Sequence, residues 1–124
     1  MEITDKIKNI IDEIVRQYKP EKIILFGSLA WGNSNKDSDI DLLVIKDSRK
    51  KRFERERELR SKLFGHNFPA IDILVYTPEE IRKSINEYKN LFIEDILRNG
   101  RVIYTKPGSV FSITFPKRPL NILH

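Results

Sequence analysis

Residues 26–44 read FGSLAWGNSNKDSDIDLLV, and this stretch decides the fold. It opens on the last residue of a short apolar run, residues 22–26, which we interpret as a buried strand because no polar residue interrupts the run after Lys22. A polar loop follows, and residues 40–45 form a second apolar run of the same kind. The sequence therefore predicts two buried strands, with Gly27 at the point where the first strand passes into the loop.

Two aspartates, Asp39 and Asp41, stand just before and inside the second strand, among otherwise apolar residues. Side chains two residues apart on a strand lie on the same face, with α-carbons about 6.5 to 7 Å apart, so both carboxylates can reach one cation or a close pair. A third acid, Asp72, interrupts the apolar run 70–76 in the same manner. Partly buried carboxylates repel one another unless a positive charge sits among them, which favours a divalent metal site. The alternative is that each aspartate caps a helix, lies at a sheet edge or pairs with a basic residue.

The composition restricts the ligands of such a site. The chain has no cysteine, and its two histidines, His66 and His124, are too far apart in sequence to suggest a pair. Thiolate zinc sites, disulfides and thiol nucleophiles are therefore excluded. Ligation by oxygen alone selects magnesium or manganese, and magnesium in such sites also binds substrate phosphates.

Gly27 and Ser28 follow the first strand directly. A glycine lets the backbone approach an oxyanion closely, and a serine hydroxyl can add a hydrogen bond to phosphate. If the following residues form one helical turn, its amide groups also point outward. The pair indicates a phosphate-binding turn, with an ordinary strand-to-loop turn as the alternative.

Gly27-Ser28, ten intervening residues and then Asp39-Ile40-Asp41 resemble the nucleotidyltransferase signature of the DNA polymerase beta superfamily. Within that superfamily, the small size and this form of the motif resemble the minimal nucleotidyltransferase proteins that accompany a HEPN-domain toxin, and the resemblance covers residues 22–104. It implies that Asp39 and Asp41 bind two magnesium ions, with manganese as an alternative, and that Asp72 completes this catalytic site. It also implies that Gly27 and Ser28 hold the triphosphate of ATP.

The resemblance further implies a function and a partner. Such family members are antitoxins of type VII systems, which transfer AMP from ATP to a tyrosine hydroxyl of the toxin and so block its RNase activity. We therefore expect an adenylyltransferase that forms a complex with a HEPN toxin. The alternatives are an antitoxin that neutralises its toxin by binding alone, and a nucleotidyltransferase that acts on RNA or on a small-molecule hydroxyl. A chain of 124 residues leaves little room for an acceptor pocket, which favours a macromolecular acceptor.

One position departs from the family pattern. The family commonly has a basic residue just before the second glycine of the loop, where this chain has Trp31 before Gly32. Trp31 is then a residue that stacks on a base or packs against a partner, or a hydrophobic anchor beneath the loop.

The net charge of +5 is concentrated in one stretch of the chain. Residues 46–62 contain nine basic and four acidic residues, a local net charge of +5, and the remainder is neutral overall. Such a run attracts phosphates or RNA. Alternating arginine and glutamate with a thin apolar stripe, Phe53, Leu59 and Leu63, is also typical of a solvated helix, which is the interpretation we favour.

The remaining periodicity predicts an α/β (α+β) fold in which helices cover a sheet, and the resemblance implies that this is the polymerase beta type of fold, a mixed sheet flanked by helices. We expect helices over residues 4–18, 49–64 and 78–99, and strands over residues 22–26, 40–45, 70–76 and 101–104. Thr77-Pro78-Glu79-Glu80 is a capping box that begins the last helix, and Gly65 is a candidate left-handed cap.

We expect one nucleotidyltransferase domain over residues 1–105 and a C-terminal tail over residues 106–124. Phe111, Ile113 and Phe115 alternate in the tail, which indicates an extra strand or a partner-binding arm. With 40% hydrophobic and 33% charged residues and no long apolar run, the sequence is typical of a soluble protein. The first residues do not resemble a secretory signal, so we expect a cytoplasmic protein that does not act at a membrane.

Overall fold

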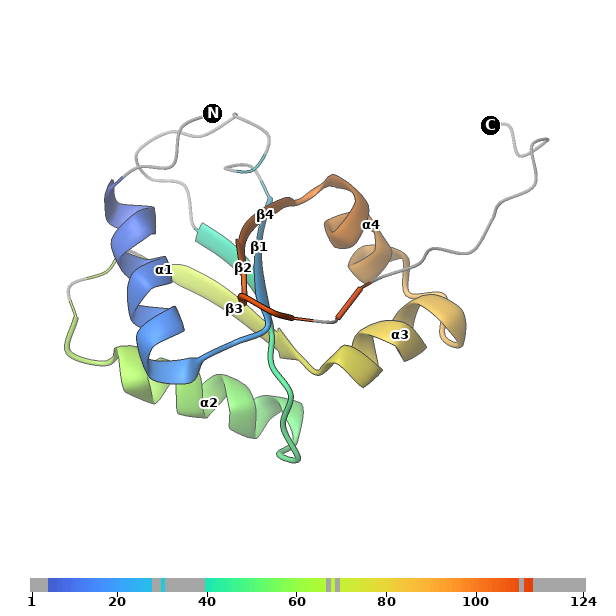
Figure 1. Ribbon diagram of the computed structural model, residues 1–124, viewed down its shortest axis with the longest axis horizontal. Helices are drawn as coiled ribbons and strands as arrows, with labels where there is room; N and C mark the ends of the chain where they lie inside the picture. The colour runs from blue at the N-terminus through green and yellow to red at the C-terminus, as the bar shows by residue number, and fades with distance from the viewer. Residues whose placement is uncertain are drawn as a thin grey trace.

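The computed structural model describes residues 5–27, 30, 40–66, 68, 70–109 and 111–112. Figure 1 shows a central layer of strands with helices on both sides. None of the helices among the described residues is long and apolar enough to cross a bilayer. In chain order the elements are α1 (Asp5–Tyr18), β1 (Lys22–Phe26), β2 (Ile40–Ile45), α2 (Arg52–Leu63), β3 (Ile71–Tyr76), α3 (Pro78–Asn86), α4 (Leu91–Asn99) and β4 (Arg101–Thr105).

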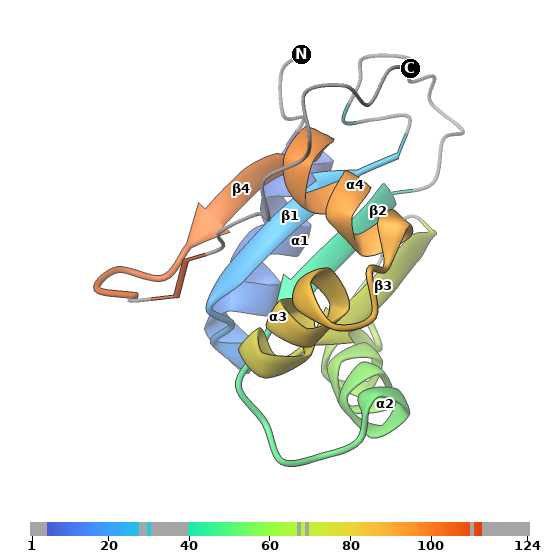
Figure 2. The same cartoon turned by 90° about the vertical axis from the view of Figure 1, so that its right-hand side faces the viewer.

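The strands form a four-stranded mixed sheet in the order β3-β2-β1-β4, which can be followed from edge to edge in Figure 2. β1 is antiparallel to β2 and β4, whereas β2 and β3 are parallel. The end of β1 therefore meets the beginnings of β2 and β3 at one end of the sheet. We call this end, which contains Asp41 and Asp72, the acidic end. A mixed sheet flanked by helices confirms the predicted fold class.

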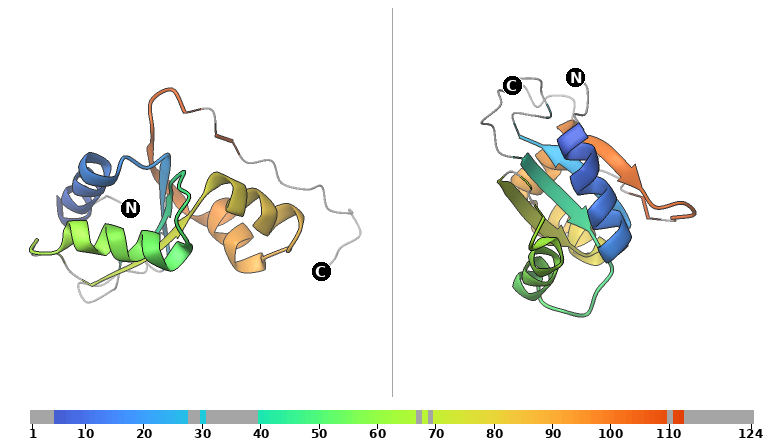
Figure 3. Two further views of the ribbon diagram at one scale, coloured as in Figure 1. Left: turned by 90° about the horizontal axis from the view of Figure 1, so that it is seen from below. Right: turned by 90° about the vertical axis from the view of Figure 1, so that its left-hand side faces the viewer.

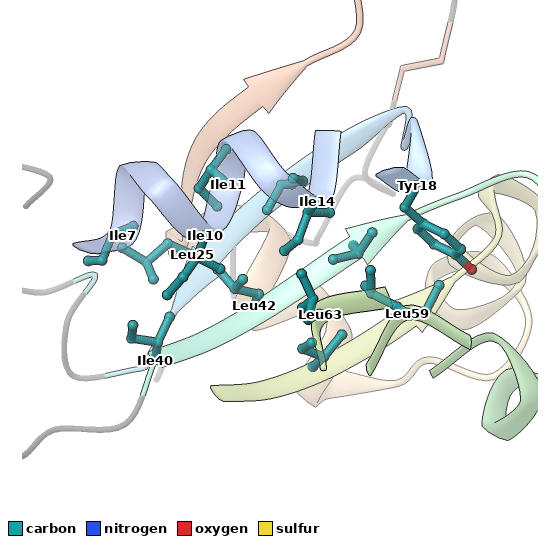
Figure 4. Close-up of a cluster of buried hydrophobic side chains, with 14 of the residues drawn as sticks. Ile7, Ile10, Ile11, Ile14, Tyr18, Leu25, Ile40, Leu42, Leu59 and Leu63 are labelled. Carbon is teal, nitrogen blue, oxygen red and sulfur yellow. The ribbon is translucent and has the colours of Figure 1, made fainter. Parts of the chain in front are cut away.

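Residues that alternate along the strands divide the core into two clusters, one on each face of the sheet. α1 and α2 cover one face (Figure 3), and the side chains between them and the sheet are drawn in Figure 4. Full burial of one such isoleucine or leucine side chain contributes about 1.5 to 3 kcal/mol. α1 supplies Ile7, Ile10, Ile11, Ile14 and Tyr18, and α2 supplies Leu59 and Leu63.

α3 and α4 cover the opposite face. Leu43 and Ile45 of β2 point to this side, while Leu42 and Val44 point to the other, as expected for a strand buried on both faces. Phe111, beyond β4, is buried against this second cluster. The helical members of the cluster are Ile81, Ile85, Ile93 and Ile96.

The predicted single helix over residues 78–99 is wrong, because the chain breaks between α3 and α4. Lys89 adopts a left-handed φ of 50°, and the Asn90 side chain accepts a hydrogen bond from the Ile93 amide at 3.1 Å. Asn90 is thus the N-cap of a new helix, a role that its short polar side chain suits better than a helix interior. Tyr88 and Phe92, which the periodicity placed on the buried face, are 69% and 57% exposed.

The predicted apolar stripe of the basic helix is also corrected. The inward positions of α2 are Arg55, Leu59 and Leu63, one helical stripe at four-residue steps, whereas Phe53 is 58% exposed. Arg55 takes the inward position because its guanidinium donates to the Val75 carbonyl at 3.1 and 3.2 Å. It also donates to the Lys50 carbonyl and pairs with Glu80 of α3.

The smaller predictions agree closely with the structure. β1 and β2 have the predicted bounds, the capping box at Thr77 is formed, and Gly65 follows α2 with a φ of 90°. α2 begins at Arg52, three residues later than expected. Of the alternating tail residues, Ile113 and Phe115 lie outside the described residues.

Candidate active site

A row of three side chains crosses the acidic end of the sheet. Phe26, the last residue of β1, pairs with Asp41 of β2, and Asp41 pairs with Asp72 of β3. Paired residues on neighbouring strands have their side chains on the same face. This is the face covered by α3 and α4, because Leu43, two residues after Asp41, belongs to that cluster. Neighbouring strands lie about 4.8 Å apart, so the two carboxylates can reach a common ligand.

The two aspartates differ in their access to solvent. Asp41 lies on an interior strand and is half-buried, whereas Asp72 lies on the edge strand β3 and is exposed. A ligand that touches both carboxylates can therefore approach from the β3 side of the row.

The backbone of Gly27 lies directly against the Asp41 carboxylate. A β-carbon built on Gly27 would be 2.2 Å from Asp41 Oδ2, a distance that real β-carbons do not show. Gly27 also has a φ of 78°, which L-residues with side chains rarely adopt. The Ala30 amide donates to the Gly27 carbonyl at 3.1 Å, and the Ala30 side chain is buried in the cluster beneath α1. A glycine is thus needed both for the turn and for the close approach to Asp41.

An aromatic pair lies beside the acidic row. The rings of Phe26 and Phe92 meet edge to face, with centroids 5.9 Å apart and an interplanar angle of 83°. Phe92 lies in the first turn of α4, and its half-exposed ring packs against Phe26, the residue that pairs with Asp41. No spacing in the sequence signals Phe92 as a site residue, because its contact with Phe26 depends on the packing of α4 across β1.

The structure brings together three of the five predicted site residues, Gly27, Asp41 and Asp72. Ser28 and Asp39 lie outside the described residues, as does Trp31. Within the described ranges there is no group of three or more histidine, aspartate or glutamate side chains placed to hold a metal ion. The described part of the site is therefore a carboxylate pair with a tight glycine turn beside it.

Comparison with known proteins identifies the class. Residues 8–108 match the family described as "Polymerase beta, Nucleotidyltransferase", which is most of the chain. The chain therefore belongs to this family, and it is a nucleotidyltransferase.

Two relatives and one solved structure illustrate the similarity. The "Putative protein adenylyltransferase MJ0604" of Methanocaldococcus jannaschii is 34% identical over 100 residues, 79% of this chain and 94% of that protein. The "Protein adenylyltransferase MntA" of Aphanizomenon flos-aquae is 29% identical over 98 residues, 72% of this chain and 59% of that protein. A toxin-antitoxin structure with AMP-PNP aligns at a TM-score of 0.46 and 20% identity, over 84% of this chain and 76% of that one, too low a similarity to support an argument.

Proposed function

We propose that this chain is a magnesium-dependent protein adenylyltransferase, an antitoxin that transfers AMP from ATP to a tyrosine hydroxyl of a HEPN-domain toxin. The observation that supports transfer chemistry most directly is the register of Asp41 and Asp72, side by side on one face with the Gly27 backbone against Asp41. The two relatives named protein adenylyltransferases support a protein as the acceptor. The HEPN toxin as partner is supported by the resemblance of the Gly27 to Asp41 motif to the minimal nucleotidyltransferases.

The residues present fit a divalent metal. Asp41 and Asp72 offer carboxylate oxygens from neighbouring strands, the donor type that magnesium prefers, and Asp72 is open to solvent. We therefore propose Asp39, Asp41 and Asp72 as the ligands. Bound magnesium would lower the pKa of the acceptor hydroxyl and neutralise the charge on the departing pyrophosphate.

In the proposed reaction, the acceptor oxygen forms a bond to the α-phosphorus of ATP while the bond from that phosphorus to the pyrophosphate oxygen breaks. The hydroxyl proton passes to Asp72 or to water. Asp72 suits the acceptor side, because it is exposed on the edge strand where a large partner has access. Gly27 and Ser28 suit the triphosphate side, because a glycine turn without a side chain lets phosphate oxygens approach the backbone.

The test is label transfer from α-labelled ATP, with magnesium, to a purified HEPN-domain toxin from the organism that produces this chain. We expect Asp41→Asn and Asp72→Asn each to lower the transfer rate at least about a hundredfold, because each removes a charge that acts on the transition state. The matched control is Asp47→Asn, an exposed aspartate just beyond the other end of β2, which should transfer at the wild-type rate. Wild-type transfer rates in both site variants would contradict the proposal.

The same samples separate chemistry from neutralisation by binding. If the toxin's RNase activity falls in step with incorporated label and Asp72→Asn leaves it active, transfer is the neutralising step. Full inhibition by Asp72→Asn without label would instead favour a binding antitoxin.

A further inference from the structure

A row of four exposed residues runs along the solvent side of α2. Phe53, Arg57, Arg60 and Phe64 are spaced by four, three and four residues, so they lie within one narrow sector of the helix surface over a length of about 16 Å. Phe53 is 58% and Phe64 87% exposed, and both arginines are exposed. We call this row the α2 stripe.

The hydrophobic core does not include the α2 stripe. The side of α2 that faces the core is formed by Arg55, Leu59 and Leu63. The two phenylalanines therefore leave large apolar surfaces in water at both ends of the stripe, although a polar residue would serve a purely solvated helix face equally well.

Each of the three glutamates of α2 has a partner within the protein, and for Glu56 and Glu58 that partner is a basic side chain. Glu54 accepts a hydrogen bond from the Lys51 amide at 3.2 Å, Glu56 pairs with Arg52 at 3.8 Å, and Glu58 pairs with Lys50 at 3.0 Å. None of these acids is directed to the arginines of the stripe.

The charges of the two stripe arginines are consequently not paired with these glutamates. Arg57 has no carboxylate partner among the described residues, and its guanidinium lies over the Phe53 ring at 5.5 Å from the centroid. Arg60 donates to the Ile71 carbonyl at 3.1 Å, which fixes its direction without neutralising it. The stripe is thus a preorganised positive surface between two exposed rings.

We propose that the α2 stripe is a docking surface for an acidic protein. The partner would receive Phe53 and Phe64 in two apolar pockets about 16 Å apart and place carboxylates between them, opposite Arg57 and Arg60. Exposed aromatic residues and arginine are the types enriched at protein interfaces and among the residues that dominate binding energy.

The observations favour a protein over RNA. Single-stranded nucleic acid stacks successive bases on neighbouring aromatic rings along a groove. Here the rings stand three helical turns apart on a convex helix, and the charge between them consists of two arginines, one of which already contacts a ring. This spacing suits pockets on a folded partner.

The stripe also reaches the acidic end of the sheet. Arg60 contacts the carbonyl of Ile71, the residue before Asp72, so the Phe64 end of the stripe lies at the same end of the sheet as the site, although α2 covers the opposite face of the sheet. Because Asp72 is exposed on the edge strand β3, a protein docked on α2 would contact its carboxylate by reaching around that edge. The docking itself does not depend on the proposed transfer reaction.

The experiment begins with photo-crosslinking in the cells that naturally produce the protein. p-Benzoylphenylalanine replaces Phe53, Phe64 or, as a control for similar exposure elsewhere, Val102, which is 53% exposed on β4 at the opposite edge of the sheet from β3. We expect one acidic protein crosslinked from positions 53 and 64 and not from 102. Nuclease-sensitive adducts, lipid adducts or equal capture at all three positions would overturn the proposal.

The captured protein is then purified and titrated with the full chain. We expect Arg57→Glu and Phe64→Ser each to weaken Kd by about tenfold or more. Lys8→Glu, which makes the same charge change at an exposed position near the start of α1, should leave Kd within about twofold. Unchanged affinity in Arg57→Glu, or equal weakening by Lys8→Glu, would overturn the proposal, and thermal melts of each variant show that it is folded.

Discussion

Gly27 satisfies two demands at one position, a left-handed φ and the absence of any atom where the Asp41 carboxylate lies. We predict that Gly27→Ala lowers nucleotidyl transfer at least about a hundredfold, because the added carbon would displace Asp41 by an ångström or more. Transfer kinetics would measure the loss of activity, and urea unfolding would measure any change in stability.

Gly108 provides the matched control for this prediction. It has the same φ of 78°, but a β-carbon there would meet no atom within 4 Å. Gly108→Ala should therefore cost only the backbone strain, about 1 to 2 kcal/mol, and leave transfer unchanged. Equal loss of activity in both variants would show that strain, and not the contact with Asp41, is responsible.

Tyr18 is a buried residue whose hydroxyl has no hydrogen-bond partner among the described residues. Burial, together with the nearby charge of Glu58 and against the opposing effect of Arg55, raises the pKa of Tyr18 to about 12. The folded-state pKa thus lies above the unfolded value of about 10. The contribution to stability is complete below pH 10 and is lost as the pH rises toward 12, because the unfolded chain ionises first.

We predict that Tyr18→Phe removes the loss of stability at high pH. At pH 7 the variant should be as stable as the wild type or up to about 1 kcal/mol more stable, because it no longer buries an unpaired hydroxyl. Above pH 10 the stability of the variant relative to the wild type should increase. Urea unfolding at pH 7 and pH 11 measures both values, with the exposed Tyr88→Phe as reference. If the wild type is clearly more stable than Tyr18→Phe at pH 7, the Tyr18 hydroxyl does form a hydrogen bond in the folded protein.

At the scale of the elements, Arg55 joins three of them, since it lies on α2, donates to β3 through Val75 and pairs with Glu80 at the start of α3. We predict that Arg55→Met lowers the free energy of unfolding by about 2 to 4 kcal/mol, because it leaves buried carbonyls without donors. Arg57→Met on the same helix should change it by less than about 0.5 kcal/mol. Chemical denaturation compares them, and similar losses in both would contradict this account of α2.

The strands and α1 were predictable because their apolar patterns leave one packing solution. The runs 22–26 and 40–45 have no polar face, and α1 has a single apolar stripe. The inward side of α2 was not predictable, because Arg55 is buried by donating to the Val75 carbonyl of β3, twenty residues away. Nor was the break at Lys89, since the periodicity continues through it and the local cap at Asn90 prevails.

The candidate site was likewise predictable only in part. Motif spacing placed acids on two strands, but the pairing of Asp41 with Asp72 is a property of the sheet register, which no spacing contains. Phe92 joined the site only through the packing of α4 on β1. Local chemistry is thus readable in the sequence, whereas contacts between elements require the fold.

At the scale of the whole molecule, the sheet lies between two hydrophobic clusters, and the acidic end joins β1, β2 and β3 at one point (Figure 2). A ligand held there contacts three strands that must all be folded, so it binds the native state and not the unfolded chain. Ligand binding should therefore raise the melting temperature by mass action.

We predict that magnesium and a non-hydrolysable ATP analogue together, at about one hundred times Kd, stabilise the protein by about 2.7 kcal/mol. For a chain of this size that corresponds to a rise of about 10 °C in Tm. Either component alone, or both with excess EDTA, should give a small fraction of this shift. Differential scanning calorimetry measures it directly.

The double variant Asp41→Asn, Asp72→Asn separates specific binding from general ion effects. Asparagine has nearly the size and shape of aspartate, so the variant should remain folded and melt close to the wild-type temperature without ligands. It should nevertheless lose the ligand-dependent rise, because the carboxylates proposed to hold the metal are absent. A full rise in the double variant would place nucleotide binding away from the acidic end and would contradict the assignment of the site.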